Sequence, residues 1–341
     1  MVDIDGQAAS SSSLRPLVAV VTPVYNGGPL LARTLACVQS QTYPNIVHVV
    51  LDNASKDATP DLIAAAAGGS KRIITRRNAA LLPQIENWNA AMAMAPPEAR
   101  YIKLLTADDL MRKDCVEKMV AAAELDPEID FVHAIDVFGG WTKPHGLDPA
   151  KTVYSGAEYG RRWMAGEITW LSGSHMFFRA RPALLKETFS REIFPLMDME
   201  FIFRELLNRK MAFVFEPLIF TRYTENAVTA KLGGLSSYIM PSYRLLLKHG
   251  RKFLDEQAFA TARRRGHVKI ARHLLAASVT GHPMAVQIRD GLDKEKLSVG
   301  PSDYISAVAG WPLHKLTSSM RNMRRNDSDP PVPIGEEYFA S

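Results

Sequence analysis

The stretch Tyr101-Ile-Lys-Leu-Leu-Thr-Ala-Asp-Asp109 decides the fold, because a strand-like run ends abruptly in two adjacent carboxylates. Parallel strands of α/β proteins are buried along their length, and their carboxyl ends open onto the crevice where ligands bind. Asp108 and Asp109 could hold a divalent cation there, and the cation could hold a substrate's phosphates. Alternatively, one of them N-caps the helix expected over residues 115–125, since aspartate is a favoured cap. The pair alone leaves both interpretations open.

The region before this stretch alternates strands and helices. Apolar, β-branched runs at residues 17–22, 46–51 and 73–74 predict strands, and the segments between them carry helix start and stop signals. This rhythm predicts an α/β fold with a Rossmann-like, mostly parallel sheet flanked by helices. Because the carboxyl ends of parallel strands meet at one edge, we expect Asp52, which follows the second strand, to lie near Asp108.

Composition is that of an ordinary soluble globular protein. Hydrophobic residues make up 47% and charged residues 23% of the 341 positions, which allows an ample core. The net charge of +5 favours anionic small molecules or an anionic membrane surface, but is too diffuse to predict nucleic-acid binding. Cys37 and Cys115 lack metal-type spacing, so we expect two free thiols in a reducing compartment. No secretion signal or membrane-spanning run is recognised, which predicts a cytoplasmic protein.

Four regions are expected along the chain. Residues 1–15 are rich in Ser and Ala and predicted to be disordered, and residues 16–230 form the α/β domain. Residues 231–320 contain basic amphipathic stretches, which predict a C-terminal helical appendage. Its Arg263–Arg265 run is ordinarily a solvated face; peripheral association with anionic lipid at the inner face of the membrane is the sharper alternative. Residues 321–341 are proline-rich with little apolar mass, which predicts a disordered tail.

Seven motifs follow one another in a specific order and spacing. They are Leu17-Val-Ala-Val-Val-Thr-Pro-Val-Tyr-Asn26, Gln41-Thr-Tyr-Pro-Asn45, Leu51-Asp-Asn-Ala-Ser55, Asn87-Trp-Asn-Ala-Ala91, Tyr101 to Asp109, Asp198-Met-Glu-Phe-Ile-Phe-Arg204 and Glu216-Pro-Leu-Ile-Phe-Thr-Arg222. Together they resemble the family 2 glycosyltransferases, which are inverting, nucleotide-sugar-dependent enzymes with the GT-A fold. The resemblance covers roughly residues 17–229, and none of the motifs is decisive alone.

The resemblance implies roles for individual residues. The implied donor-binding residues are Pro23, Tyr25, Asn26, Asp52, Asn89, Ala107 and Asp109. Among them, the Asp52 carboxylate would accept a hydrogen bond from the ring N–H of a uracil or thymine base. Asp108 would bind Mn²⁺ or Mg²⁺ bridging the donor's diphosphate. Asp198 would be the general base that deprotonates the acceptor hydroxyl, a role that chemistry alone also assigns to a carboxylate across the crevice from the metal.

Two departures from the family pattern bear on metal binding and on the product. Thr106 stands where the family often has the first Asp of its D-x-D element, and Thr224 stands where many members carry a histidine. Metal binding would therefore rest on Asp108 with help from Asp109. The Gln-x-x-Arg-Trp signature of processive polymer synthases is absent, which favours the addition of a single sugar.

The expected function is transfer of one sugar from a UDP or dTDP sugar to a hydroxyl of a glycan, lipid-linked or small acceptor, in surface polysaccharide or glycoconjugate synthesis. A nucleotidyltransferase is one rival, but Gly27 and Gly28 after the first strand have no nearby lysine to form a phosphate loop. A non-catalytic nucleotide-sugar-binding protein is the other, and Thr106 keeps it open. We expect no nucleic-acid partner, and the sequence makes no prediction of oligomeric state.

Overall fold

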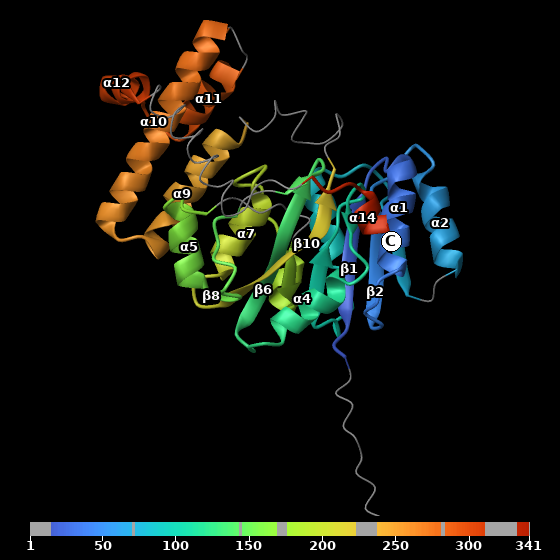
Figure 1. Cartoon of the computed structure of the whole chain (residues 1–341). Helices are drawn as coiled ribbons and strands as arrows, with labels where there is room; N and C mark the ends of the chain where they lie inside the picture. The colour runs from blue at the N-terminus through green and yellow to red at the C-terminus, as the bar shows by residue number, and fades with distance from the viewer. Residues whose placement is uncertain are drawn as a thin grey trace, which may run out of the picture.

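The computed structural model describes residues 15–69, 72–142, 145–168, 176–222, 237–280, 284–310 and 333–340, and Figure 1 shows a central sheet with helices around it. The strands are β1 (Val18–Val24), β2 (Ile46–Asp52), β3 (Ile73–Arg77), β4 (Tyr101–Leu104), β5 (Leu110–Met111), β6 (Ile129–Phe138), β7 (Trp141–Thr142), β8 (Val153–Ser155), β9 (Phe177–Arg179) and β10 (Lys210–Thr221). The helices are α1 (Gly28–Gln39), α2 (Thr59–Gly69), α3 (Gln84–Met92), α4 (Cys115–Ala123), α5 (Gly156–Met164), α6 (Pro182–Lys186), α7 (Met197–Glu205), α9 (Ile239–Phe253), α10 (Glu256–Thr280), α11 (Met284–Lys294), α12 (Pro301–Ala309) and α14 (Glu337–Ala340). The predictions made for residues 1–14 and for Thr224 lie outside the described residues.

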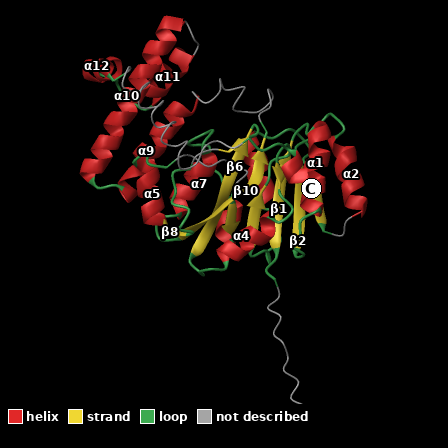
Figure 2. Ribbon diagram, viewed as in Figure 1, coloured by secondary structure: helices red, strands yellow, loops and turns green. Residues whose placement is uncertain are grey.

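The sheet has the strand order β3-β2-β1-β4-β9-β6-β10-β5, with β7 paired to β6 and β8 paired to β10. Figure 2 shows its strands in yellow with the helices in red around them. Strands β3, β2, β1, β4, β6 and β10 run in one direction, and the short strands β5, β7, β8 and β9 run the other way. The prediction of an α/β fold with a mostly parallel sheet is therefore confirmed. Strand β1 lies between β2 and β4, so the carboxyl ends of these three strands lie at the same edge.

Helices cover both faces of the sheet, as the alternation of side chains along β1 requires. Ala19 and Val21 belong to a core cluster that includes Ile85 and Met92 of α3 and aromatic residues of α7. Val18 and Val20, which point the other way, belong to a cluster built with α1 and α4. Cys37 and Cys115 are buried in this second cluster as free thiols, as expected.

The C-terminal helices α9 to α12 stand at the α5 end of the sheet, away from α2 (Figure 1). Helix α9 is joined to the sheet domain by apolar contacts: Leu245 is fully buried in the same cluster as Phe201 and Phe203. The boundary expected at residue 230 thus separates two parts that share one core. Within the described ranges, no helix combines the length and apolarity needed to cross a bilayer.

The prediction of a disordered C-terminal tail is wrong for residues 333–340. Pro333 forms a β-bridge with Trp141, and the N–H of Ile334 donates to the carbonyl of Gly140 at 2.9 Å. Phe339 is only 3% exposed and contacts Phe220, with ring centroids 5.5 Å apart. The prediction from composition failed because a segment this short needs little apolar mass to dock on an existing core. One buried aromatic side chain and a few backbone hydrogen bonds are enough.

Candidate functional site

The loops after β1 and β2 are hydrogen-bonded to each other at the carboxyl edge of the sheet. Asn26 has a φ of 50°, in the left-handed region that asparagine tolerates better than most residues. Its N–H donates to Oγ of Ser55 at 2.9 Å, and its Oδ1 accepts from the N–H of Lys56 at 2.9 Å. Pro23 is buried within β1, whereas the Tyr25 side chain is 46% exposed. The structure therefore brings Tyr25 and Asn26 to the edge where Asp52 ends β2.

Asp52 is 3% exposed and held from two directions. Its Oδ1 accepts a hydrogen bond from the N–H of Ser55 at 3.0 Å. Its Oδ2 lies 2.9 Å from Nη1 of Arg77 on β3, but accepts no well-aligned hydrogen bond from a described residue. Arg77 also donates to the Ser55 carbonyl at 2.8 Å, which fixes the turn. A buried, charge-balanced carboxylate oxygen with remaining acceptor capacity suits recognition of a ligand N–H.

An asparagine network behind Asp52 was not anticipated. Asn78 donates to Oδ1 of Asn53 at 2.9 Å and to Oδ1 of Asn87 at 3.0 Å, while the Asn53 amide donates to the Leu82 carbonyl at 2.8 Å. These bonds join the ends of β2 and β3 to α3. The only signal in the sequence is that Asn53 and Asn78 each directly follow a strand.

Asn89 does not lie free for donor binding, contrary to expectation. Its amide nitrogen donates to the Phe189 carbonyl at 2.8 Å, and its amide oxygen accepts from the Phe189 N–H at 2.8 Å. This two-way bond makes Asn89 a clamp between α3 and the segment before α7. The motif Asn87-Trp-Asn89 is engaged within the protein: Asn89 bonds the backbone of Phe189, Trp88 contacts the Phe189 ring, and Asn87 accepts from the Asn78 side chain.

The two acids in the loop after β4, Asp108 and Asp109, have different environments. Asp109 is 2% exposed, and its carboxylate accepts from the backbone N–H of Arg222 at 2.9 Å and from the Thr106 hydroxyl. Both oxygens are thus engaged by the protein, which differs from the expectation that Asp109 contacts the donor. Asp108 is half-buried, and burial raises the pKa of its carboxyl above the usual range. Ala107 bonds the loop after β4 to α1, because its carbonyl accepts a hydrogen bond from the Thr34 hydroxyl at 3.0 Å.

Neither acid of this loop caps a helix. Helix α4 begins at Cys115, and its N-cap residue is Asp114. The capping interpretation is therefore wrong, and Asp108 is left with a carboxylate at the carboxyl end of the sheet. Within the described residues, no three His, Cys, Asp or Glu side chains converge to hold a metal ion by themselves. Asp108 fits a site of the Mg²⁺ type, in which one or two carboxylates act together with substrate phosphates and water.

Asp198 and Glu200, at the start of α7, have opposite environments. Asp198 is 6% exposed, and burial raises its pKa to about 7, although the backbone N–H of Met199 donates to its carboxylate at 2.8 Å. Glu200 is fully buried, which alone would raise its pKa, but His249, Lys248 and Arg204 lower it to about 2. Glu200 is therefore a permanently charged structural anion, and Asp198 is the acid that can exchange a proton near neutral pH.

The topology predicts that Asp198 lies on the crevice side. Strand β10 runs parallel to β6 and in the same direction as β4, so Lys210 lies at the edge where these strands begin. Helix α7 ends at Glu205, close to that edge in the chain. A helix of nine residues spans about 13 Å, so its first turn, with Asp198, lies toward the carboxyl edge.

Arg222, immediately after β10, is the second feature that the sequence did not bring out. It is 8% exposed, its Nη1 donates to the Asp108 carbonyl, and its Nε and Nη2 lie 2.7 and 2.9 Å from the two carboxylate oxygens of Glu336. Arg33 of α1 also pairs with Glu336. Because Glu336 lies in the tail that was expected to be disordered, sequence reasoning had no reason to look for this contact.

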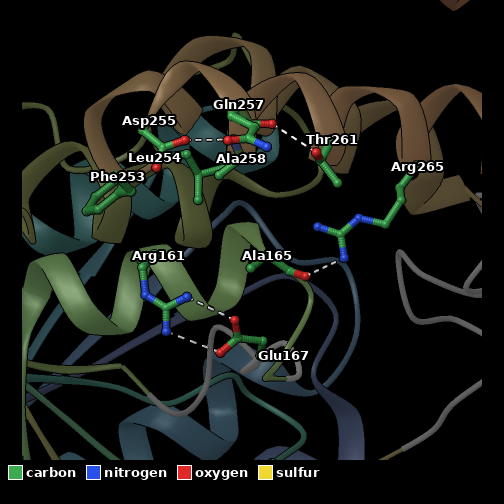
Figure 3. A pocket seen from close by; sticks show the side chains of 10 residues that line it. All are labelled: Arg161, Ala165, Glu167, Phe253, Leu254, Asp255, Gln257, Ala258, Thr261 and Arg265. Carbon is green, nitrogen blue, oxygen red and sulfur yellow. Dashed lines mark hydrogen bonds and ion pairs between the residues drawn. The ribbon is translucent and has the colours of Figure 1, made fainter.

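A cleft of about 480 Å³ lies between α5 and the start of α10 (Figure 3). Arg161 pairs with Glu167 on one side, and Arg265 donates to the Ala165 carbonyl at 2.7 Å on the other. None of the residues expected to bind donor or metal lines this cleft. It is the seam between the sheet domain and the C-terminal helices.

Comparisons with known proteins find similarity to glycosyltransferases. Residues 19–185 match the profile of the family described as Glycosyl transferase family 2. A proposed teichuronic acid biosynthesis glycosyltransferase of Bacillus subtilis (strain 168), TuaG, is 31% identical over 110 residues. That alignment covers 31% of this chain and 41% of TuaG, so the chain spans less than half the length of this relative.

Two solved structures share the fold. S. aureus TarS 1–349 in complex with UDP-GlcNAc is 16% identical with a TM-score of 0.60, covering 80% of this chain and 79% of the TarS chain. The mannosyltransferase PcManGT from Pyrobaculum calidifontis, in complex with GDP-Man and Mn²⁺, is 16% identical with a TM-score of 0.52, covering 89% and 81%. Identities this low establish the GT-A architecture of the chain and leave its substrates open.

Proposed function

We propose that this chain, whose residues 19–185 match the family 2 glycosyltransferase profile, is an inverting enzyme that moves one sugar from a UDP or dTDP sugar to a hydroxyl of a glycan, lipid-linked or small acceptor. The observation that carries the proposal is Asp198: a buried carboxyl with a pKa of about 7 at the crevice end of α7. A general base works best when its pKa lies near the operating pH. The neighbouring Glu200, held by the cationic side chains of Arg204 and Lys248 and by His249, is not available for that task.

The donor would lie across the carboxyl ends of β1, β2 and β4. Asp52 would accept the ring N–H of uracil or thymine, and the exposed Tyr25 ring lies at the same edge for stacking on the base. Asp108 would hold the divalent cation together with the diphosphate. Support for a nucleotide-sugar donor and for Mn²⁺ comes from TarS with UDP-GlcNAc and PcManGT with GDP-Man and Mn²⁺.

The chemistry is a single displacement at the anomeric carbon. The Asp198 carboxylate takes the proton of the acceptor hydroxyl as the acceptor oxygen forms its bond to that carbon. The bond between the sugar and the diphosphate breaks on the opposite face, and the nucleoside diphosphate leaves with its electron pair. A bound divalent cation would neutralise charge developing on this leaving group. The product therefore has the inverted anomeric configuration.

The acceptor belongs to the same proposal. A surface glycan or lipid-linked intermediate is the class we favour, since TuaG is named for teichuronic acid biosynthesis. The C-terminal helices α9 to α12 then lie beside the α7 side of the crevice, where an acceptor would enter. We propose that the transfer takes place in the cytoplasm, with contact to a membrane surface through the basic helix α10.

Asp198→Asn tests the mechanism, because it preserves shape and removes the proton acceptor. We expect the variant to bind UDP in Mn²⁺ like the parent and to hydrolyse or transfer from its UDP sugar at least about a hundredfold more slowly. Turnover is measured as release of nucleoside diphosphate over a panel of UDP, dTDP and GDP sugars. Asp61→Asn, at an exposed acid in the first turn of α2, is the matched control.

Several outcomes would contradict the proposal. Near-normal turnover by Asp198→Asn together with an inactive, folded Glu200→Gln would move the base to Glu200. A product that retains the donor's configuration in its NMR spectrum excludes single displacement. Release of pyrophosphate from a nucleoside triphosphate would indicate a nucleotidyltransferase, and binding of UDP sugars without any turnover would indicate a binding protein.

A further inference from the structure

Residues 333–340 form a strap that packs on β5 and β10 through α14. Uncharged contacts help to hold it in place. Phe339 is 3% exposed on the Phe220 ring, and the Ile334 N–H is bonded to the Gly140 carbonyl. The Tyr338 hydroxyl accepts from Nη1 of Arg112 at 2.6 Å. Removing the charge of one strap residue should therefore leave the strap docked.

Glu336 is the strap residue that reaches toward the candidate site. Its carboxylate receives Nε and Nη2 of Arg222 in a two-pronged ion pair, at 2.7 and 2.9 Å, and also pairs with Arg33. Two-pronged pairs of this kind are among the strongest and most directional that proteins make. Arg222 itself is 8% exposed, so little water reaches its guanidinium.

Both arginines adjoin the loop that holds Asp108. The backbone N–H of Arg222 donates to Oδ1 of Asp109 at 2.9 Å, and its side chain donates to the Asp108 carbonyl. Next to Arg33, the Thr34 hydroxyl donates to the carbonyl of Asp109 at 2.9 Å. Glu336 is thus the shared anion of two cations that flank the Asp108–Asp109 loop.

The charge of Arg222 has few alternatives to Glu336. A poorly solvated guanidinium needs a counter-charge, and after Glu336 the carboxylates that act on Arg222 are those of Asp109 and Asp108. Asp109 already bonds the Arg222 N–H and the Thr106 hydroxyl. If Glu336 lost its charge, Arg222 would therefore be drawn toward the Asp108 carboxylate. An arginine paired with that carboxylate would compete with a cation for the same oxygens.

We propose that Glu336 is a positioning residue for the donor site: by neutralising Arg222, it keeps the Asp108 carboxylate open to a divalent cation and the diphosphate that the cation carries. The inference rests on the proposed metal site at Asp108. It makes the end of the chain, 114 positions beyond Arg222, part of the donor-binding apparatus without touching the donor. Residues that act through a metal ligand in this way typically change metal affinity by about 10–100-fold.

The test compares the full-length parent with Glu336→Gln, Glu336→Asp and the control Glu337→Gln, which removes an equal charge from the exposed neighbouring position. Mn²⁺ affinity is measured from the electron paramagnetic resonance signal of free Mn²⁺ in the presence of UDP, and UDP affinity is measured by calorimetry in EDTA.

We expect Glu336→Gln to weaken Mn²⁺ binding about tenfold. Its metal-free UDP affinity should stay within twofold of the parent, Glu336→Asp should recover part of the loss, and Glu337→Gln should match the parent. Phe339→Ala, which loosens the strap with Glu336 intact, should also weaken Mn²⁺ binding.

The outcomes separate this inference from the proposed function. Parent-like Mn²⁺ binding by a folded Glu336→Gln, with Mn²⁺ binding lost in Asp108→Asn, overturns the role of Glu336 and keeps the metal site. A rise in UDP affinity of Glu336→Gln in EDTA overturns it too, because Glu336 would then be a competitor of the diphosphate for the arginines. If the parent shows no Mn²⁺-dependent binding of UDP, the metal site fails and the inference fails with it.

Discussion

Two acidic pairs of the candidate site, Asp108–Asp109 after β4 and Asp198–Glu200 at the start of α7, show the same contrast between their members. In each pair one carboxylate is saturated by groups of the protein: Asp109 by a backbone N–H and a hydroxyl, Glu200 by Arg204, Lys248 and His249. The other carboxylate is half-buried in Asp108 and buried in Asp198, and burial raises the pKa of both.

Within each pair, we expect the saturated carboxylate to contribute to stability and the other carboxylate to contribute to chemistry. A carboxylate whose acceptor sites are filled lowers the free energy of the folded state and has nothing left to offer a substrate. A carboxylate that is desolvated without compensation costs stability, and residues with that property concentrate at functional sites. The environments of the four carboxylates therefore predict that Asp108 and Asp198 take part in chemistry and that Asp109 and Glu200 stabilise the fold.

The largest expected effect is on the stability of the α7 pair. Glu200→Gln leaves Arg204, Lys248 and His249 around a neutral amide, and breaking a buried ion pair in this way typically costs about 3 kcal/mol or more. Asp198→Asn removes a poorly compensated charge and should leave the free energy of unfolding unchanged or higher. Urea denaturation of the two variants measures the difference.

Glu192→Gln is the control for this prediction, since Glu192 pairs with the same Lys248 but its side chain is 61% exposed. It should cost under about 1 kcal/mol. Equal destabilisation by Glu200→Gln and Glu192→Gln would mean that the burial of Glu200 adds nothing to the free energy of unfolding. It would contradict the structural role predicted for Glu200.

The next effect concerns the β4 pair. Asp108→Asn should abolish the gain in UDP affinity produced by Mn²⁺ and leave the melting temperature unchanged. Asp109→Ala should lower the free energy of unfolding by about 1–3 kcal/mol, because the Arg222 N–H and the Thr106 hydroxyl lose their acceptor in a buried position. Calorimetry and thermal denaturation give both readouts. Unchanged metal-dependent binding in Asp108→Asn would show that Asp108 has only a structural role.

The last prediction concerns the pH dependence of stability, where Asp198 and Glu200 act with opposite sign. The folded-state pKa of Asp198, about 7, lies above its ordinary 3.8, so its favourable contribution is complete below pH 3.8 and is lost as the pH rises to 7. The pKa of Glu200, about 2, lies below its ordinary 4.5, so its contribution is present above pH 4.5 and is lost as the pH falls toward 2.

Differences in the free energy of unfolding between parent and variant isolate each group. Asp198→Asn should gain on the parent as the pH rises from 4 to 8, and the deficit of Glu200→Gln should shrink below pH 4.5. The turnover rate of the parent should rise with pH with an apparent pKa of about 7, since the base must be ionised. A turnover rate that stays flat from pH 5 to 8 would contradict the assignment of Asp198.

The sequence by itself determined the architecture and the location of the candidate site. Strand periodicity, helix start and stop signals and the alternation of the two are local properties, so residues 17–138 are enough to predict a largely parallel sheet. The position of Asp52 and Asp108 directly after strands then follows from the geometry of such sheets. Because these signals are local, the acids of both pairs can be recognised from the order of residues along the chain.

Only the tertiary structure decided which member of each pair is saturated. Arg222 reaches Asp109 from 113 positions away, and Lys248 reaches Glu200 from 48. The tertiary structure also pairs Asn89 with the backbone of Phe189, 100 positions away, and pairs Glu336 of the strap with Arg222. The physical reason is the same in each case: the state of a buried polar group depends on partners that folding brings from distant parts of the chain, and no local pattern encodes those partners.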